Sequence, residues 1–69
     1  MKFDYAYHIT VDGKVVFLGT DLKIQMVGAK DTKEGKLVKI GPKGIYVSFQ
    51  NLMNPQFLNF NNIAAIEEV

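Results

Sequence analysis

The sequence predicts an all-β domain, folded as a small, strongly bent open barrel with an additional β-hairpin on its N-terminal side. Apolar and polar residues alternate over residues 3–11, which is the pattern of a half-buried strand. Two turn signals, Asp12-Gly13 and the tetrapeptide Gly41-Pro42-Lys43-Gly44, each lie between apolar runs. A helix is not expected, because the one helix-compatible stretch, residues 63–69, is too short to be stable.

Length and composition limit how this domain can be stabilised. The chain has 69 residues, is 48% hydrophobic and contains no Cys. A domain of this size buries only about 60% of its unfolded surface, so its core is marginal. Disulfides are excluded, and a single His cannot form a zinc site alone. We therefore expect one domain over residues 1–69, without cofactor or metal, that gains stability by self-association.

The first nineteen residues predict a hairpin. Residues 3–11 form its first strand, Asp12-Gly13 form a two-residue type I′ turn, and residues 14–18 return. This register predicts two apolar cross-strand pairs on one face, Ile9 with Val16 and Tyr7 with Leu18.

Residues 22–69 predict a five-stranded core. The expected strands cover 22–29, 35–40, 45–49, 56–60 and 63–69, with a polar turn over 30–34, a loop over 51–55 and a tight turn at Asn61-Asn62. Leu37 and Ile40 are three residues apart, so a bulge or sharp bend is needed to bring both to the same face. Strands 56–60 and 63–69 are the expected sheet edges.

This second region resembles the Sm-like (LSm/Hfq-type) family over about residues 22–69. Gly35, Leu37 and Ile40 have the spacing of the Gly-x-Leu-x-x-Phe pattern that opens the family's first motif. The other similar positions are Ile45, Val47, Phe49 and Asn51 in the following strand, and Ile63 and Ile66 after the Asn61-Asn62 turn. The resemblance implies a strongly bent five-stranded open barrel that assembles into a homo-oligomeric ring of roughly five to eight subunits.

The positions at which that family reads RNA differ in this chain. Gly41 and Gly44 stand where the family usually has Asp and Asn, and Phe60-Asn61-Asn62 replaces the Arg-Gly or Lys-His pair. The resemblance still implies single-stranded RNA at a basic pore face, through Lys43, Tyr46, Asn61 and Asn62. It also implies a subunit interface along the two edge strands, formed by Phe57, Leu58, Phe60, Ile63 and Ile66.

Each of these residues also has a simpler interpretation. Lys43 is equally a solvated turn residue, and the two Asn residues equally form a tight turn. Tyr46, which alternation places away from the core, could stack on a base or lie in a subunit interface. The chain lacks Arg and has a net charge of +1, which favours the alternative of an SH3-like protein-interaction or self-assembly module without nucleic-acid binding.

Catalysis and membrane insertion are not expected. His8 has no evident nucleophile beside it, and Glu67 and Glu68 would point to opposite faces of a strand. The start of the chain lacks the pattern of a signal peptide, and no apolar run approaches the length of a membrane span. These features predict a cytoplasmic protein that is not an enzyme, of bacterial or phage type.

Overall fold

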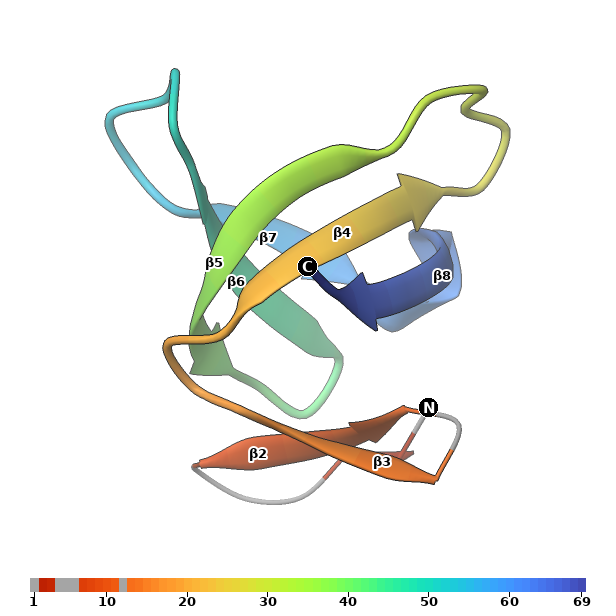
Figure 1. Ribbon diagram of the computed structural model, residues 1–69, viewed down its shortest axis with the longest axis vertical. Coiled ribbons are helices and arrows are strands. Elements are labelled where there is room, and N and C mark those ends of the chain that lie inside the picture. Colours follow the sequence, from red (N-terminus) through yellow and green to blue (C-terminus); the bar gives the residue numbers. More distant parts are fainter. Residues whose placement is uncertain (1, 4–6, 12) are drawn as a thin grey trace.

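The computed structural model describes residues 2–3, 7–11 and 13–69, which fold into two antiparallel sheets (Figure 1). The first sheet has the order β1-β2-β3, with β1 Lys2–Phe3, β2 His8–Val11 and β3 Lys14–Phe17. The second has the order β7-β6-β5-β4-β8, with β4 Asp21–Met26, β5 Lys33–Ile40, β6 Gly44–Phe49, β7 Gln56–Asn59 and β8 Ile63–Glu68. A single 3₁₀ turn, η1 Phe60–Asn62, joins β7 to β8. The all-β expectation is confirmed.

The β2–β3 hairpin has the predicted register. Ile9 is paired with Val16, and Val11 with Lys14 across a two-residue turn. The Leu18 N–H donates to the Tyr7 carbonyl oxygen at 2.9 Å, which continues the hairpin by one residue. Gly13 has a φ of 80°, as a type I′ turn requires at its second position. Asp12, the other turn residue of that prediction, lies outside the described residues.

The prediction of one continuous strand over residues 3–11 is wrong. β1 and β2 are separate strands that run antiparallel to each other, with Lys2 opposite Thr10 and Phe3 opposite Ile9. Period-two alternation indicates which face a residue takes, and it carries no information about whether the strand turns back on itself. The added strand turns a two-stranded ribbon, which is marginal alone, into a three-stranded sheet.

In the five-stranded sheet, the predicted bulge and both predicted edges are confirmed. The β5–β6 register shifts between Leu37 and Lys39, and β7 and β8 each have a neighbour on one side only. Some predicted boundaries are wrong: β4 ends at Met26 rather than 29, and β5 begins at Lys33 rather than 35. Lys33 and Glu34 belong to the strand because their backbones pair with Ile24 and Lys23 of β4, so polar composition alone misplaced the turn.

One apolar cluster joins the two sheets. Its buried members are Ile9, Val16, Leu22, Ile24, Leu37, Ile45, Val47, Ile63 and Ile66. Backbone hydrogen bonds between the β3–β4 connection and β5 reinforce the contact, since Gly19 N–H donates to Leu37 O at 2.7 Å and Leu37 N–H to Thr20 O at 3.0 Å. The connection therefore fixes the N-terminal sheet against the second sheet.

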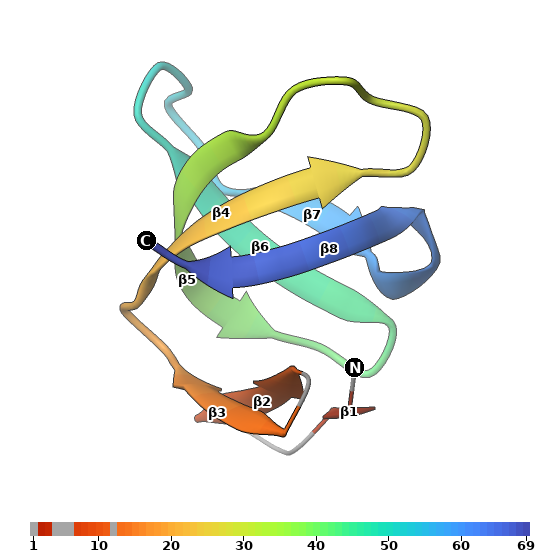
Figure 2. The ribbon, with the colours of Figure 1, turned by 45° about the vertical axis from the view of Figure 1, so that its right-hand side comes forward.

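The second sheet is strongly curved, and its two ends differ (Figures 1 and 2). The N-terminal sheet lies across the end near the β5–β6 loop, where Ile9 and Val16 enter the core. We call this the closed end. The β4–β5 and β6–β7 connections lie at the opposite end, in both views. We call that the open end.

Candidate functional site

Two connections that are distant in the sequence lie side by side. The Phe60 N–H, at the start of η1, donates to the Lys43 carbonyl oxygen of the β5–β6 loop at 2.9 Å. The loop itself is closed by a 2.9 Å hydrogen bond from the Gly41 N–H to the Gly44 carbonyl oxygen. Lys43 and the Asn61-Asn62 pair, which the resemblance predicts as RNA-binding residues, are thus neighbouring segments of one surface.

This proximity depends on a glycine. Gly44 is buried and pairs with Asn59 of β7. A Cβ atom at this position would collide with the Leu58 carbonyl oxygen and would lie 2.9 Å from the Asn59 Cα. Only glycine lets the two backbones approach this closely, so the sequence itself holds the two connections together.

The predicted contact residues are held by backbone bonds while their side chains remain exposed. Lys43, Asn61 and Asn62 are all exposed. The Asn61 N–H donates to Asn59 Oδ1 at 2.8 Å, and the Asn62 carbonyl oxygen accepts from the Val27 N–H at 2.8 Å. The tight turn predicted at Asn61-Asn62 is this η1 turn. The Lys43 ammonium and the two side-chain amides can therefore contact a ligand without rearrangement of the turn.

Tyr46 belongs to a different part of the surface, a row that crosses three strands. Its cross-strand partners are Lys39 on β5 and Phe57 on β7. The Tyr46 and Phe57 ring centroids are 5.2 Å apart with the rings tilted by 55°, and the Lys39 Nζ lies 5.4 Å from the Tyr46 ring centroid. We call these three residues the aromatic row. Sequence reasoning missed Lys39, because its place opposite Tyr46 depends on where the bulge falls.

The residues predicted for a subunit interface occupy three environments. Phe57 is 47% exposed, and Leu58 and Phe60 are half-buried against the core. Ile63 and Ile66 are buried in the core of the same chain. An edge contact through β8 would therefore use the strand's backbone, with the Ile63 and Ile66 side chains directed inward.

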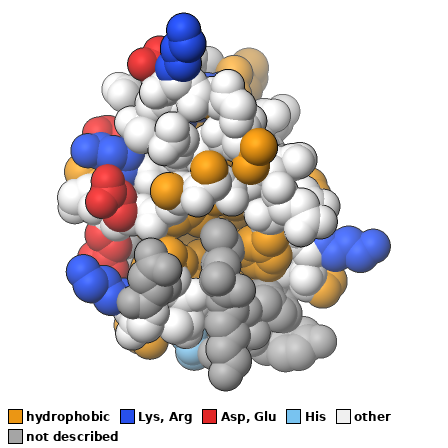
Figure 3. Space-filling view, turned by 90° about the vertical axis from the view of Figure 1, so that its right-hand side faces the viewer, with side chains coloured by type: hydrophobic (Ala, Val, Ile, Leu, Met, Phe, Trp, Pro, Cys, Tyr) orange, Lys and Arg blue, Asp and Glu red, His pale blue; other side chains and the backbone are white. Residues whose placement is uncertain are grey.

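The charged residues of β4, β5 and β8 alternate in sign instead of forming a basic face. Lys23 on β4 has Glu34 on one side and Glu67 on the other. Figure 3 shows Lys and acidic side chains together along one margin of the molecule, and exposed hydrophobic side chains nearer the middle of the same face. Cross-strand pairs of opposite charge stabilise a sheet modestly and cancel its field at a distance. Attraction for a polyanion thus depends on local groups such as Lys43.

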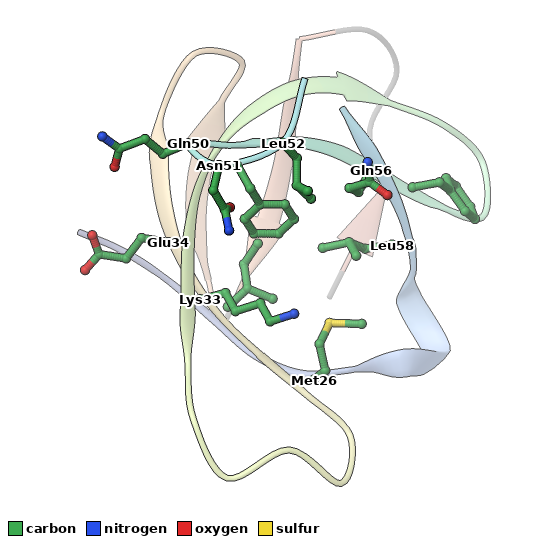
Figure 4. Close-up of a pocket in the computed structure, with 11 residues that line it drawn as sticks. Met26, Lys33, Glu34, Gln50, Asn51, Leu52, Gln56 and Leu58 are labelled. Atoms are coloured by element: carbon green, nitrogen blue, oxygen red, sulfur yellow. The ribbon is translucent and has the colours of Figure 1, made fainter. Parts of the chain in front are cut away.

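The open end contains a pocket of about 940 Å³. Its apolar walls come from Ile24, Met26, Phe49, Leu52 and Leu58, and its polar border from Lys33, Asn51 and Gln56. Figure 4 shows the Met26, Leu52 and Leu58 side chains directed toward one another across this space, whereas Glu34 and Gln50 point away from it. No feature of the sequence pattern singled this pocket out, because its walls come from three strands and a loop.

In the described part of the chain, no three His, Asp or Glu side chains gather into a possible ion site. Among those same residues, none of the helical segments has the length and hydropathy to cross a membrane. No protein-family model, curated protein or solved structure matches this chain.

Proposed function

We propose that this chain assembles edge to edge into a homo-oligomeric, Sm-like ring that binds single-stranded RNA. The observation that carries the proposal is the hydrogen bond between Phe60 and Lys43, which places a cation and two side-chain amides on one exposed surface. A Lys ammonium contacts phosphate, and an Asn amide can both donate to and accept from a base edge. One such surface is small, and a ring would repeat it around a common axis.

The two unpaired edges support assembly. β7 and β8 lie at opposite sides of the sheet, so pairing β7 of one copy with β8 of the next is a head-to-tail contact. Such a contact closes into a ring when the rotation between copies permits. It would also satisfy the backbone donors and acceptors that an edge strand otherwise leaves open.

RNA binding is tested with labelled uridine-rich and adenine-rich oligoribonucleotides, by fluorescence anisotropy over about 50 to about 200 mM KCl. We expect the affinity to fall as salt increases, and Lys43→Gln to weaken binding to both oligoribonucleotides. Lys14→Gln is the matched control, because Lys14 is an exposed turn-flanking lysine on the N-terminal sheet. Affinity that is independent of salt, or equal for the two variants, would refute the phosphate contact.

Assembly is tested separately by native mass spectrometry and by light scattering coupled to size exclusion. A mass of about five to eight chains is expected. Proline at Phe57 or Glu68 would remove an outward-facing edge N–H from β7 or β8 respectively, and either variant should shift the mass to a single chain. A wild-type protein that stays monomeric at high concentration would refute ring assembly.

One observation favours the SH3-like alternative, a protein-interaction module. The aromatic row presents two adjacent rings and a lysine on the outer face of β5, β6 and β7, and Tyr and Phe are enriched where proteins bind one another. This reading predicts a monomer whose partner binding is lost with Tyr46→Ala and is insensitive to Lys43→Gln.

A further inference from the structure

The two ends of the curved sheet leave different amounts of apolar surface uncovered. At the closed end Ile9 and Val16 are almost completely buried and fill the space between the sheets. At the open end Met26, Phe49 and Leu58 are only half-buried, and a pocket of about 940 Å³ lies between them. Among the described residues, no side chain from elsewhere in the chain fills this space as Ile9 and Val16 do at the other end.

We propose that the open-end pocket binds a small amphiphilic anion, which consists of an aliphatic body and one carboxylate. Small-molecule sites typically have volumes of about 300 to 1,000 Å³, apolar walls and a few polar groups that orient the ligand. The open-end pocket has this size and this composition. The closed end indicates the kind of group that suits the interior of the sheet, since branched aliphatic side chains fill it there.

The charge at the pocket border selects an anion. Lys33 is the one basic residue of the lining, and Figure 4 shows its side chain extending into the pocket toward Met26. The Lys33 ammonium makes no ion pair or hydrogen bond with another described residue. Glu34, the one acidic residue of the lining, points out of the pocket. A carboxylate placed over the apolar walls would therefore meet a cation and no competing carboxylate.

A side-chain amide can complete the site. Figure 4 shows the polar end of Asn51 directed into the pocket beside Leu52. An amide N–H donates to a carboxylate oxygen, so Asn51 adds a second polar group to the border of the pocket. Gln56 has a different role, because its Nε2 donates to the Asn54 carbonyl oxygen at 2.9 Å and so fastens the 50–55 loop that forms the border.

The lining does not suit a nucleobase equally well. Base binding usually depends on stacking against exposed aromatic faces. Phe57 borders the pocket, but its ring packs against Tyr46 on the outer face, which leaves Phe49 as the one aromatic wall. One cation also matches one carboxylate better than it matches a chain of phosphates. The pocket is separate from the proposed RNA-binding surface, which lies at the β5–β6 loop and η1.

The test uses three amphiphiles of equal chain length, all below their micelle concentrations. Decanoate, decanol and decyltrimethylammonium compete for 8-anilinonaphthalene-1-sulfonate bound to the full chain, and two-dimensional amide NMR spectra map their contacts. We expect decanoate to bind about tenfold more tightly than the trimethylammonium analogue, and the difference to shrink as salt increases. Amide shifts should centre on residues 24–26, 33, 49–52 and 56–58.

Matched variants measure the contribution of the Lys33 charge to binding separately from that of the apolar walls. Lys33→Gln should weaken decanoate about five- to tenfold and leave decanol unchanged, whereas Leu52→Gln should weaken both ligands. Lys14→Gln is the control for charge. Met53→Gln is the control for the loop, because Met53 is fully exposed next to Leu52 and does not line the pocket. Both controls should bind like the wild-type chain.

Several results would overturn the proposal. These are equal affinity for the three amphiphiles, amide shifts centred on the closed end, and a loss of decanoate binding that is the same in Lys14→Gln and Lys33→Gln. Displacement of the dye by oligoribonucleotide in a Lys33-dependent manner would assign the pocket to RNA instead. Loss of dye binding in step with self-association would assign it to a second copy. Because every readout is repeated in Lys43→Gln, failure of RNA binding at the other surface leaves this test intact.

Discussion

The closed and the open end of the curved sheet are lined by similar apolar residues, but these residues are buried to different extents. At the closed end Ile9 is 0% and Val16 is 2% exposed, and the N-terminal sheet contributes both. At the open end Leu52 is 46% exposed, and Met26, Phe49 and Leu58 behind it are half-buried. A small sheet needs one well-packed end to be stable, since its core is marginal. The other end keeps a pocket with partly exposed apolar walls.

The largest difference in unfolding free energy is expected between two variants that introduce an aspartate, one at the closed end and one at the open end. Val16→Asp places a carboxylate in an apolar site, at a cost comparable with the total stability of about 3 to 10 kcal/mol expected for this length. We expect Val16→Asp to be unfolded at 25 °C and Leu52→Asp to change the unfolding free energy by less than about 1 kcal/mol. Urea titrations followed by circular dichroism measure both. A folded Val16→Asp protein would show that the closed end is not tightly packed.

A second test compares two glycines of the β5–β6 loop. A Cβ at Gly44 would collide with the β7 backbone, whereas at Gly41 the nearest atom, the Gly44 carbonyl oxygen, lies at an ordinary 3.6 Å. Gly44→Ala should therefore lower the unfolding free energy by at least about 2 kcal/mol, and Gly41→Ala should change it by less than about 1 kcal/mol. Equal effects of the two substitutions would mean that β6 and β7 can separate without cost. Chemical denaturation is again the measurement.

A smaller effect is expected in the aromatic row, on the wall between the two ends. A double-mutant cycle with Tyr46→Ala and Phe57→Ala should give a coupling of about 0.5 to 1.5 kcal/mol for the ring pair. Each single substitution should cost less than a truncation at Ile9, because both rings are partly solvated. Additive effects of the two changes would leave the row without an energetic role in the monomer, and would strengthen the case that it faces a partner.

The smallest effect should be at the border of the open end. Gln56→Ala removes an exposed hydrogen bond to the Asn54 carbonyl oxygen and should lower the unfolding free energy by no more than about 0.5 kcal/mol. Amide exchange should nevertheless become faster in the 50–55 loop, because the bond fastens that loop locally. A global destabilisation comparable to that of Gly44→Ala would show that the open end also supports the fold.

Local sequence signals predicted much of the fold. The Asp12-Gly13 signal gave the two-residue hairpin and the pairing of Ile9 with Val16, and the spacing of Leu37 and Ile40 gave the bulge. Polar composition was less informative, since Lys33 and Glu34 looked like turn residues and proved to be strand. Lys43, Asn61 and Asn62, which the resemblance grouped together, lie on adjoining segments, whereas the place of Lys39 opposite Tyr46 was missed.

What the sequence alone determined about this protein is its local geometry: most of the strands and turns, the hairpin register, the bulge and the two edges. These depend on side-chain alternation and on the backbone preferences of a few turn residues, which act over short separations along the chain. The tertiary structure decided how β1 folds back onto β2, which end of the sheet is covered, that Phe60 bonds to Lys43, and that a pocket remains between Met26, Leu52 and Leu58. These features depend on contacts between residues far apart in the sequence, and no local periodicity encodes them.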